Sequence, residues 1–114
     1  MDSILTSIKK LAGIDENYEI FDPDIIMHIN SVFMILRQMG IGPSGGFTIS
    51  DDSAVWTDYI PNVEKIEAVK TYIAMKVRLV FDPPTSSALL DALKQSIQEY
   101  EWRLNVEAET PTIT

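Results

Sequence analysis

The sequence contains no cysteine and only one histidine, and both absences limit its chemistry. Without cysteine the chain can form neither a disulfide nor a thiolate zinc site, and it has no cysteine nucleophile. It also lacks an apolar run close to the roughly 20 residues that span a bilayer, and its N-terminal segment does not resemble a secretion signal. We therefore expect a soluble protein with no membrane partner, made in a reducing cytosol.

Basic residues are scarce as well. Nine lysines and arginines stand against 17 aspartates and glutamates, which gives a formal net charge of −8. Such a surface repels a phosphate backbone, so ordinary binding of DNA or RNA is disfavoured. The 114 residues, 46% of them hydrophobic, predict one globular domain that would gain stability by associating with copies of itself or with partners.

Apolar residues recur at steps of three and four in four segments, which predicts an all-α fold. A capping residue, a proline in the first turn or a glycine after the last turn marks most of their ends. The expected helices are residues 2–12 before Gly13, a segment capped by Asp22 that starts with Pro23 and stops at Gly40, residues 62–81 capped by Asn62, and a segment from Thr85 or Ser86 to about Leu104. Together they predict a small bundle of about four helices.

The middle of the chain is less regular. Residues 40–53 hold four of the five glycines and are expected to form an irregular Gly-rich loop. Gly45 and Gly46 ahead of Phe47 predict a turn that leads into a short extended piece. One or two helical turns are expected over residues 54–60.

A break and a tail complete the expected organisation. Neither proline of a Pro-Pro pair can continue a helix, and the residue before a proline avoids the helical conformation. The polar stretch 105–114 has no periodicity, so we expect a flexible C-terminal tail after a helical domain of residues 1–104. The residues of the expected structural corner are Phe81, Asp82, Pro83 and Pro84.

Candidates for catalysis or metal binding are few. No nucleophile or metalloprotease motif surrounds His28, and we interpret it as a residue at the edge of the second helix's buried face. Aspartates 22, 24, 51 and 52 lack the alternating spacing of a calcium loop, and the first two are explained by a helix start. The glycines match neither a P-loop nor a dinucleotide fingerprint. The sequence thus predicts a protein that is not an enzyme and has no metal or cofactor.

The two tryptophans allow two interpretations each. Most tryptophans complete a core, whereas tryptophan and arginine also dominate binding hot spots. Trp102 lies two residues from both Tyr100 and Leu104, so it falls outside the apolar stripe of the last helix. The candidate interface residues are Trp56, Trp102, Arg103, Asn105, Val106 and Pro111.

Five stretches together carry a family resemblance that covers nearly the whole chain in order. They are Asp24 to Ser31, Gly40 to Pro43, Lys70-Thr71-Tyr72-Ile73 continuing through Lys76-Val77-Arg78-Leu79, Phe81-Asp82-Pro83-Pro84-Thr85-Ser86-Ser87, and Glu99 through Glu101-Trp102-Arg103-Leu104-Asn105. The FDPPTSS corner followed by EWRLN is the most specific pairing. In these stretches the chain resembles the head–tail connector (adaptor) family of long-tailed bacteriophages.

The resemblance implies a structural virion protein at the head–tail junction, assembled in the host cytoplasm. Subunits would form a ring, expected to be a dodecamer that matches the portal protein. One face of the ring would contact the portal and the other the head-closure (stopper) protein, while DNA passes through the channel without specific binding. Residues 105–114 would reach toward the portal.

The residues alone leave a second function open. A small acidic helical regulator or adaptor, binding a host or phage protein as a monomer or dimer, would have the same composition and periodicity. Its state of association would distinguish it from a ring subunit.

Overall fold

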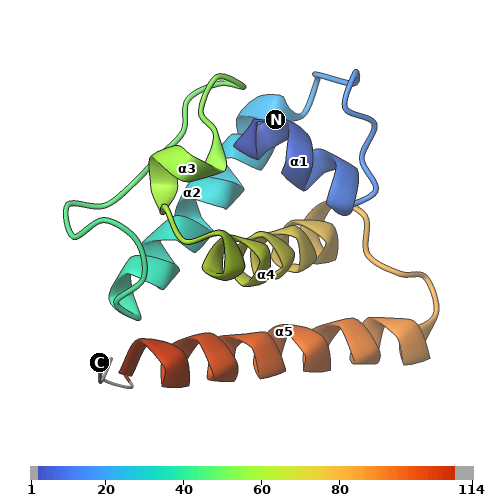
Figure 1. Cartoon of the computed structure of the whole chain (residues 1–114). Helices are drawn as coiled ribbons and strands as arrows, with labels where there is room; N and C mark the ends of the chain where they lie inside the picture. The colour runs from blue at the N-terminus through green and yellow to red at the C-terminus, as the bar shows by residue number, and fades with distance from the viewer. Residues whose placement is uncertain (1–2, 110–114) are drawn as a thin grey trace.

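The computed structural model describes residues 3–109, which form helices and no strand (Figure 1). The helices are α1 (Ile4–Leu11), α2 (Asp22–Gln38), α3 (Trp56–Tyr59), α4 (Val63–Phe81) and α5 (Ser87–Glu109). Helix α4 runs through the middle of the molecule, with α1, α2 and α3 on one side and α5 along the other (Figure 1). The predicted all-α bundle is confirmed.

Local sequence signals begin or end several of these helices, and the cap at Asn62 and the stop at Gly40 are as predicted. The Oγ of Ser3 accepts a hydrogen bond from the Thr6 N–H at 3.1 Å, and the Oδ1 of Asn62 accepts one from the Lys65 N–H at 3.2 Å. Each bond satisfies an N–H group that has no partner within its own helix. After α2, Gly40 has a φ of +92°, which an L-residue rarely adopts, and so the helix stops there.

The core lies between α1, α2 and α4. The predicted apolar stripes of α2 and α4 face each other, and one face of α1 closes the third side. Burying a large aliphatic side chain contributes about 1.5–3 kcal/mol, so these stripes supply most of the stabilisation. The buried side chains of the three helices include Ile4, Leu5, Ile8, Ile25, Ile29, Val32, Phe33, Leu36, Ile66, Val69, Tyr72, Ile73 and Val77.

Three large apolar residues that continue the helical spacing of these stripes are exposed instead. Val80 is 56% exposed, Leu89 62% and Leu11 54%. Each lies in the first or last turn of its helix. Periodicity identifies the face of a helix, but only the packing partner decides how far along the helix that face is covered.

Helix α5 is longer than the sequence predicted. It continues to Glu109 instead of ending near Leu104, because no glycine or proline occurs before Pro111. Residues 105–109 of the expected flexible tail are thus helical, and residues 110–114, Pro111 among them, lie outside the described part of the chain.

The segment between α2 and α3 is held to the core by a side chain. Phe47 to Ile49 belong to no strand. Instead the Asn30 amide bonds both backbone groups of Ile49, with its Nδ2 donating to the carbonyl at 2.9 Å and its Oδ1 accepting from the N–H at 2.8 Å. One amide therefore does what a neighbouring strand would do. Ile49 can then be buried without leaving unpaired backbone groups.

Candidate assembly surface

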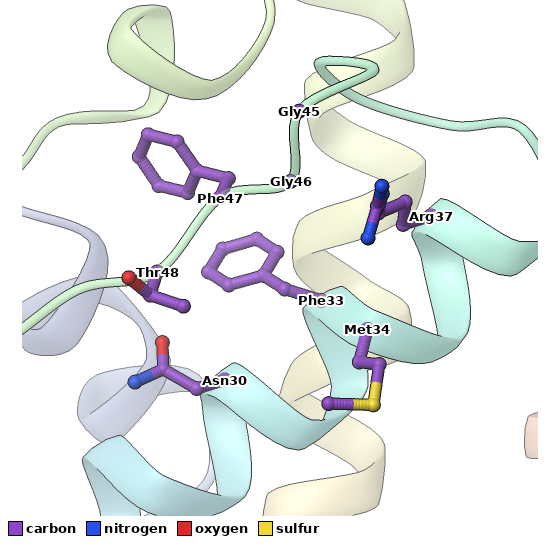
Figure 2. Close-up of a pocket in the computed structure, with 8 residues that line it drawn as sticks. All are labelled: Asn30, Phe33, Met34, Arg37, Gly45, Gly46, Phe47 and Thr48. Carbon is purple, nitrogen blue, oxygen red and sulfur yellow. The ribbon is translucent and has the colours of Figure 1, made fainter.

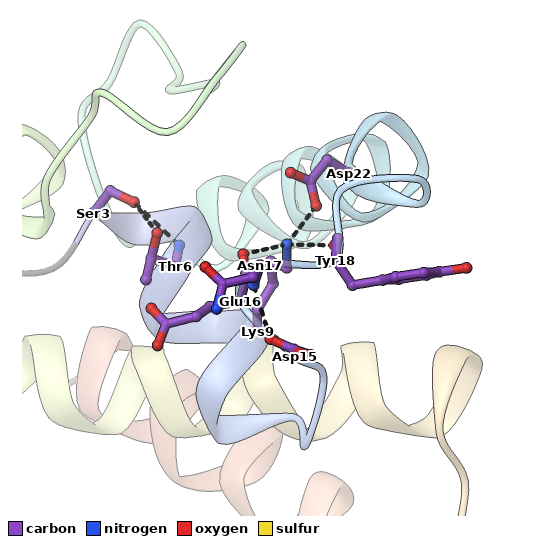
Figure 3. Close-up of polar contacts among 8 residues, drawn as sticks. All are labelled: Ser3, Thr6, Lys9, Asp15, Glu16, Asn17, Tyr18 and Asp22. Atoms are coloured by element: carbon purple, nitrogen blue, oxygen red, sulfur yellow. Dashed lines mark hydrogen bonds and ion pairs between the residues drawn. The ribbon is translucent and has the colours of Figure 1, made fainter.

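A buried lysine fixes the connection between α1 and α2. Lys9 is only 2% exposed, and its Nζ donates to the Glu16 carbonyl at 3.1 Å, the Tyr18 carbonyl at 2.8 Å and the Asp22 carboxylate at 2.7 Å (Figure 3). An ammonium has three N–H donors, so all of them are satisfied. The segment between the helices is thereby folded around one positive charge.

This arrangement corrects the predicted role of Asp22. The residue does not cap α2, because it is already the first residue of the helix and Phe21 occupies the cap position without a side-chain bond. The Asp22 carboxylate turns to Lys9 instead. A charge-assisted bond to a buried ammonium is stronger than a bond to a neutral N–H, and leaving that ammonium unpaired would be costly.

The same fold turns aromatic side chains outward beside the corner. Tyr18 and Phe21 are 45% and 47% exposed, and their rings lie 5.8 Å apart between centroids. With the end of α4 they enclose a groove of about 360 Å³, which we call the corner groove. It is lined by Gly13, Ile14, Tyr18, Phe21, Ile25, Val80, Phe81 and Asp82.

The predicted corner residues connect α4 to α5. Helix α4 ends at Phe81, and the Asp82 N–H makes a last bond to the Arg78 carbonyl at 2.9 Å. Pro83 and Pro84 follow, and α5 begins at Ser87. Phe81 and Asp82 of the corner line one wall of the corner groove, and the α1–α2 connection supplies the far wall.

A polar contact joins α5 to α4. The buried Tyr72 hydroxyl donates to the Glu101 carboxylate at 2.7 Å, and the Lys76 Nζ lies 3.6 Å from the same oxygen. Burial, and next the Glu101 carboxylate, raise the pKa of the Tyr72 phenol. With Ile97 and Leu104, which are buried against the core, this contact fixes the rotation of α5 about its own axis. Two stretches that carry the family resemblance therefore touch each other.

That rotation leaves the predicted C-terminal interface residues exposed. Trp102 is 66% exposed, and within the described residues Arg103 pairs with Glu99 of its own helix, at 2.6 Å. Asn105 and Val106 are exposed too. So much exposure is unusual for a tryptophan, because its side chain can bury about 150–250 Å² of surface.

Trp56 is placed differently, and its predicted interface role is corrected. Its side chain is 2% exposed, and its indole N–H donates to the Ser7 hydroxyl at 2.8 Å. The short helix α3 packs it against α1, so no partner can reach it in the folded subunit. The position of Trp56 beside a loop in the sequence did not indicate that Trp56 is buried while Trp102 is exposed.

A second pocket lies between α2 and the loop that follows it (Figure 2). It has a volume of about 300 Å³ and is lined by Asn30, Phe33, Met34, Arg37, Gly45, Gly46, Phe47 and Thr48. The Asn30 amide is bound to Ile49, and the Arg37 Nε donates to the Ser44 carbonyl at 3.1 Å. Its charged and amide groups therefore hold the loop in place, and the lining contains no pair of groups for acid–base chemistry.

Metal ligands and membrane spans were also sought. Within residues 3–109 no three histidine, aspartate or glutamate side chains are grouped so that they could hold a metal ion. None of the helices in that range is long and apolar enough to cross a membrane.

His28 lies at the edge of the buried face of α2, against α4. Its ring meets the ring of Phe81 edge-on, 6.1 Å away, and its buried Nε2 has no hydrogen-bond partner within the described residues. Burial lowers the pKa of His28. A hydrogen bond to the Lys76 backbone raises the pKa of His28 in part, and the positive charge of Lys76 lowers that pKa further. The environment thus suits a neutral imidazole.

We therefore expect the protein to lose stability as the pH falls from about 7.5 to about 5.5. The unfolded chain binds a proton near the ordinary histidine pKa of about 6.5, whereas the folded chain resists it, so protonation favours unfolding. Urea denaturation at several pH values measures the effect. His28→Gln, which removes the only histidine, should make the free energy of unfolding nearly independent of pH in this window. If the variant loses stability with falling pH as steeply as the wild type, other groups cause the loss.

Comparison with known proteins agrees with this arrangement. A family model described as "Phage connector protein" matches residues 4–111, which include the corner and the α4–α5 contact. No curated protein and no solved structure matches the chain. The family is structural rather than enzymatic, and its members assemble with other proteins of the phage particle. On this match over almost its full length, the chain belongs to the phage connector protein family.

Proposed function

We propose that the chain is the head–tail connector (adaptor) subunit of a long-tailed phage. Copies of it form a ring, expected to be a dodecamer, between the portal protein of the capsid and the head-closure protein of the tail. The family match over residues 4–111 supports a structural role in the virion. The exposed surface described above supports assembly.

The observation that carries the proposal is the exposure of α5. This helix has 23 residues, yet Ile97 and Leu104 are its only buried apolar side chains among those described. Trp102 and Leu89 point away from the core. A surface helix normally keeps its polar face outward, but α5 exposes Trp102 and Val106 on a second side. In an assembly, a neighbouring subunit or the portal covers the second side.

The excess of acid fits a channel through which DNA moves. A net charge of −8 per subunit is multiplied in a ring, and a negative wall repels the phosphate backbone instead of holding it. An electron-microscopy map of the ring should place many acidic side chains on the inner wall. Acidic side chains concentrated on the outer rim would contradict this part of the proposal.

Co-purification with the portal protein of the same phage tests the function. Immobilised portal should retain the protein, whereas a regulator acting as a monomer or dimer on another target would not be retained. Failure to bind the portal, with both proteins folded, would overturn the proposal.

A truncated variant tests the part assigned to the C-terminal segment. Deleting residues 105–114 removes the exposed Asn105 and Val106 with all that follows them but keeps Ile97 and Leu104, so circular dichroism should still report a folded protein. We expect portal binding to weaken by at least about tenfold, which corresponds to about 1.4 kcal/mol. Met27→Ala, at a 67% exposed position on α2, serves as a control. If the truncation binds like the control, the segment is not the portal contact.

A further inference from the structure

We infer that α5 is exchanged between copies, so that in the assembly α5 of one copy packs on α4 of the next. The inference rests on the proposed ring and specifies how one subunit holds its neighbour. Three features of the chain lead to it. Helix α5 has one main packing partner, its connection to α4 is short and stiff, and any copy can supply the contacts that it makes with α4.

Helix α5 is attached to the rest of the subunit through α4. Within the described residues α4 is the helix against which it packs extensively, and Figure 1 shows it along the side of α4 that faces away from α1, α2 and α3. Its 23 residues exceed the length of about 12–15 below which an isolated helix is marginal in water. It can therefore separate from α4 as one unit, because the core takes only Ile97 and Leu104 from it as buried side chains among those described.

The connection between α4 and α5 is short and stiff. It spans residues 82–86. Pro83 and Pro84 have fixed φ angles, and each holds the residue before it in an extended conformation. The reversal that folds α5 back onto α4 therefore falls on the two residues that follow the prolines. Short connections of this kind favour exchange of the element that follows them.

Hydrogen bonds do little to hold this connection in its present path. Neither proline has an N–H group to donate, and within the described residues no hydrogen bond joins residues 83–86 to α1, α2 or α3. Ser86 accepts its bonds from Leu89 and Leu90 of α5 itself. Figure 1 shows the connection as an open stretch at one end of the two helices. A different path would break no bond to the body of the subunit.

The contacts between α4 and α5 do not depend on which copy supplies α5. The Tyr72 hydroxyl of α4 donates to the Glu101 carboxylate of α5 at 2.7 Å, and the Lys76 Nζ lies 3.6 Å from the same oxygen. Neither contact uses a residue of the connection. Exchange conserves both of them, together with the burial of Ile97 and Leu104. Its cost is mainly the freedom that two copies lose when they associate.

Exchange also gives the assembly a direction. Each copy gives its α5 to one neighbour and receives α5 from the other, so the two surfaces that it uses differ. Such a contact closes into a ring or extends into a filament. The portal holds the copies side by side, and the high effective concentration there offsets the lost freedom. We therefore expect α5 to lie on its own α4 in the dilute subunit and on that of a neighbour in the assembly.

A native ion pair tests the inference without any substitution. A carbodiimide joins an amine to a carboxylate that it contacts, and Lys76 and Glu101 form such a pair across the two helices. Copies labelled with a heavy nitrogen isotope and unlabelled copies are mixed in equal amounts, assembled on immobilised portal, cross-linked and digested. Exchange predicts that peptides joined through Lys76 and Glu101 carry mixed isotopes as often as a single isotope.

The same sample contains its own control. Lys70 and Glu67 pair within α4 at 3.5 Å, so their product comes from one chain and carries one isotope. The dilute mixture without portal should give single-isotope products for Lys76 and Glu101 as well. If portal-bound rings also give only single-isotope products, the inference is overturned and the proposed function stands. A folded protein that the portal does not retain would overturn both.

A shortened connection tests the inference through geometry. Deleting Thr85 and Ser86 removes the residues in which the chain reverses, so α5 can reach α4 only on another copy. Light scattering should show self-association at a concentration at least about tenfold lower than for the wild type. Inserting a short Gly-Ser segment at the same place lets α5 fold back and should not promote association. A shortened protein that keeps its helical circular dichroism but stays monomeric at high concentration would contradict the inference.

Discussion

Replacing Lys9 by methionine should lower the free energy of unfolding by about 2–3 kcal/mol, near the lower end of values for breaking a buried ion pair. Methionine keeps most of the apolar length of the side chain but removes all three hydrogen bonds of the ammonium. The Asp22 carboxylate, 21% exposed, would lose its partner, although water can reach part of it and reduce the cost. For a domain of this size the melting temperature should fall by about 10 °C.

The neighbouring lysine provides the matched control. Lys10 lies 47% exposed, and its Nζ is 3.6 Å from a Glu16 carboxylate that is 42% exposed. Surface pairs of this kind contribute about 0–1 kcal/mol, so Lys10→Met should be close to neutral in urea denaturation. Equal effects of the two substitutions would show that the buried position of Lys9 has no energetic importance.

The two tryptophans should respond very differently to alanine. Trp56→Ala removes a buried ring and should cost about 3–5 kcal/mol, a large part of the roughly 5–15 kcal/mol that stabilises a typical domain. Trp102→Ala removes a side chain that is 66% exposed, and surface changes usually stay within about 0.5 kcal/mol. Chemical denaturation of both variants measures the contrast.

Fluorescence adds a second readout and a check on the hydrogen bond. In the Trp102→Ala variant the remaining emission comes from buried Trp56 and should be blue-shifted and poorly quenched by iodide. Ser7→Ala should cost about 1–3 kcal/mol, because it leaves the buried indole N–H without its acceptor. If Trp56→Ala proved no more harmful than Trp102→Ala, the assignment of Trp56 to the core would be wrong.

The structure of the assembly surface could be predicted from the sequence only in part. Composition, periodicity and the Pro-Pro pair predicted the helices and the corner, and they placed Trp102 outside the apolar stripe of the last helix while leaving open whether it is buried. The corner groove was not predicted, because its two walls come from segments far apart in the sequence. One wall is the α1–α2 connection with Tyr18, and the other is the end of α4 with Val80, about 60 residues later. No local pattern brings such segments together.

Lys9 shows the same limit in a single residue. Its place next to Lys10 at the end of a short amphipathic helix is typical of a solvated cation that complements the helix dipole. The structure buries it instead, because the chain reverses direction after Gly13 and brings two carbonyls and Asp22 around the ammonium. A sequence signal existed only in the acidic residues that follow it, and these are common throughout the chain.

The sequence by itself determined the features that depend on neighbours along the chain. These are the all-α class, the cap at Asn62, the stop at Gly40 and the absence of cysteine chemistry, since backbone conformation and covalent composition are local properties. Tertiary structure alone decided which tryptophan is buried, where the Asp22 carboxylate points and which ends of the apolar stripes stay exposed. Those outcomes depend on which distant segment covers a residue, and the coverage is decided by packing over the whole chain.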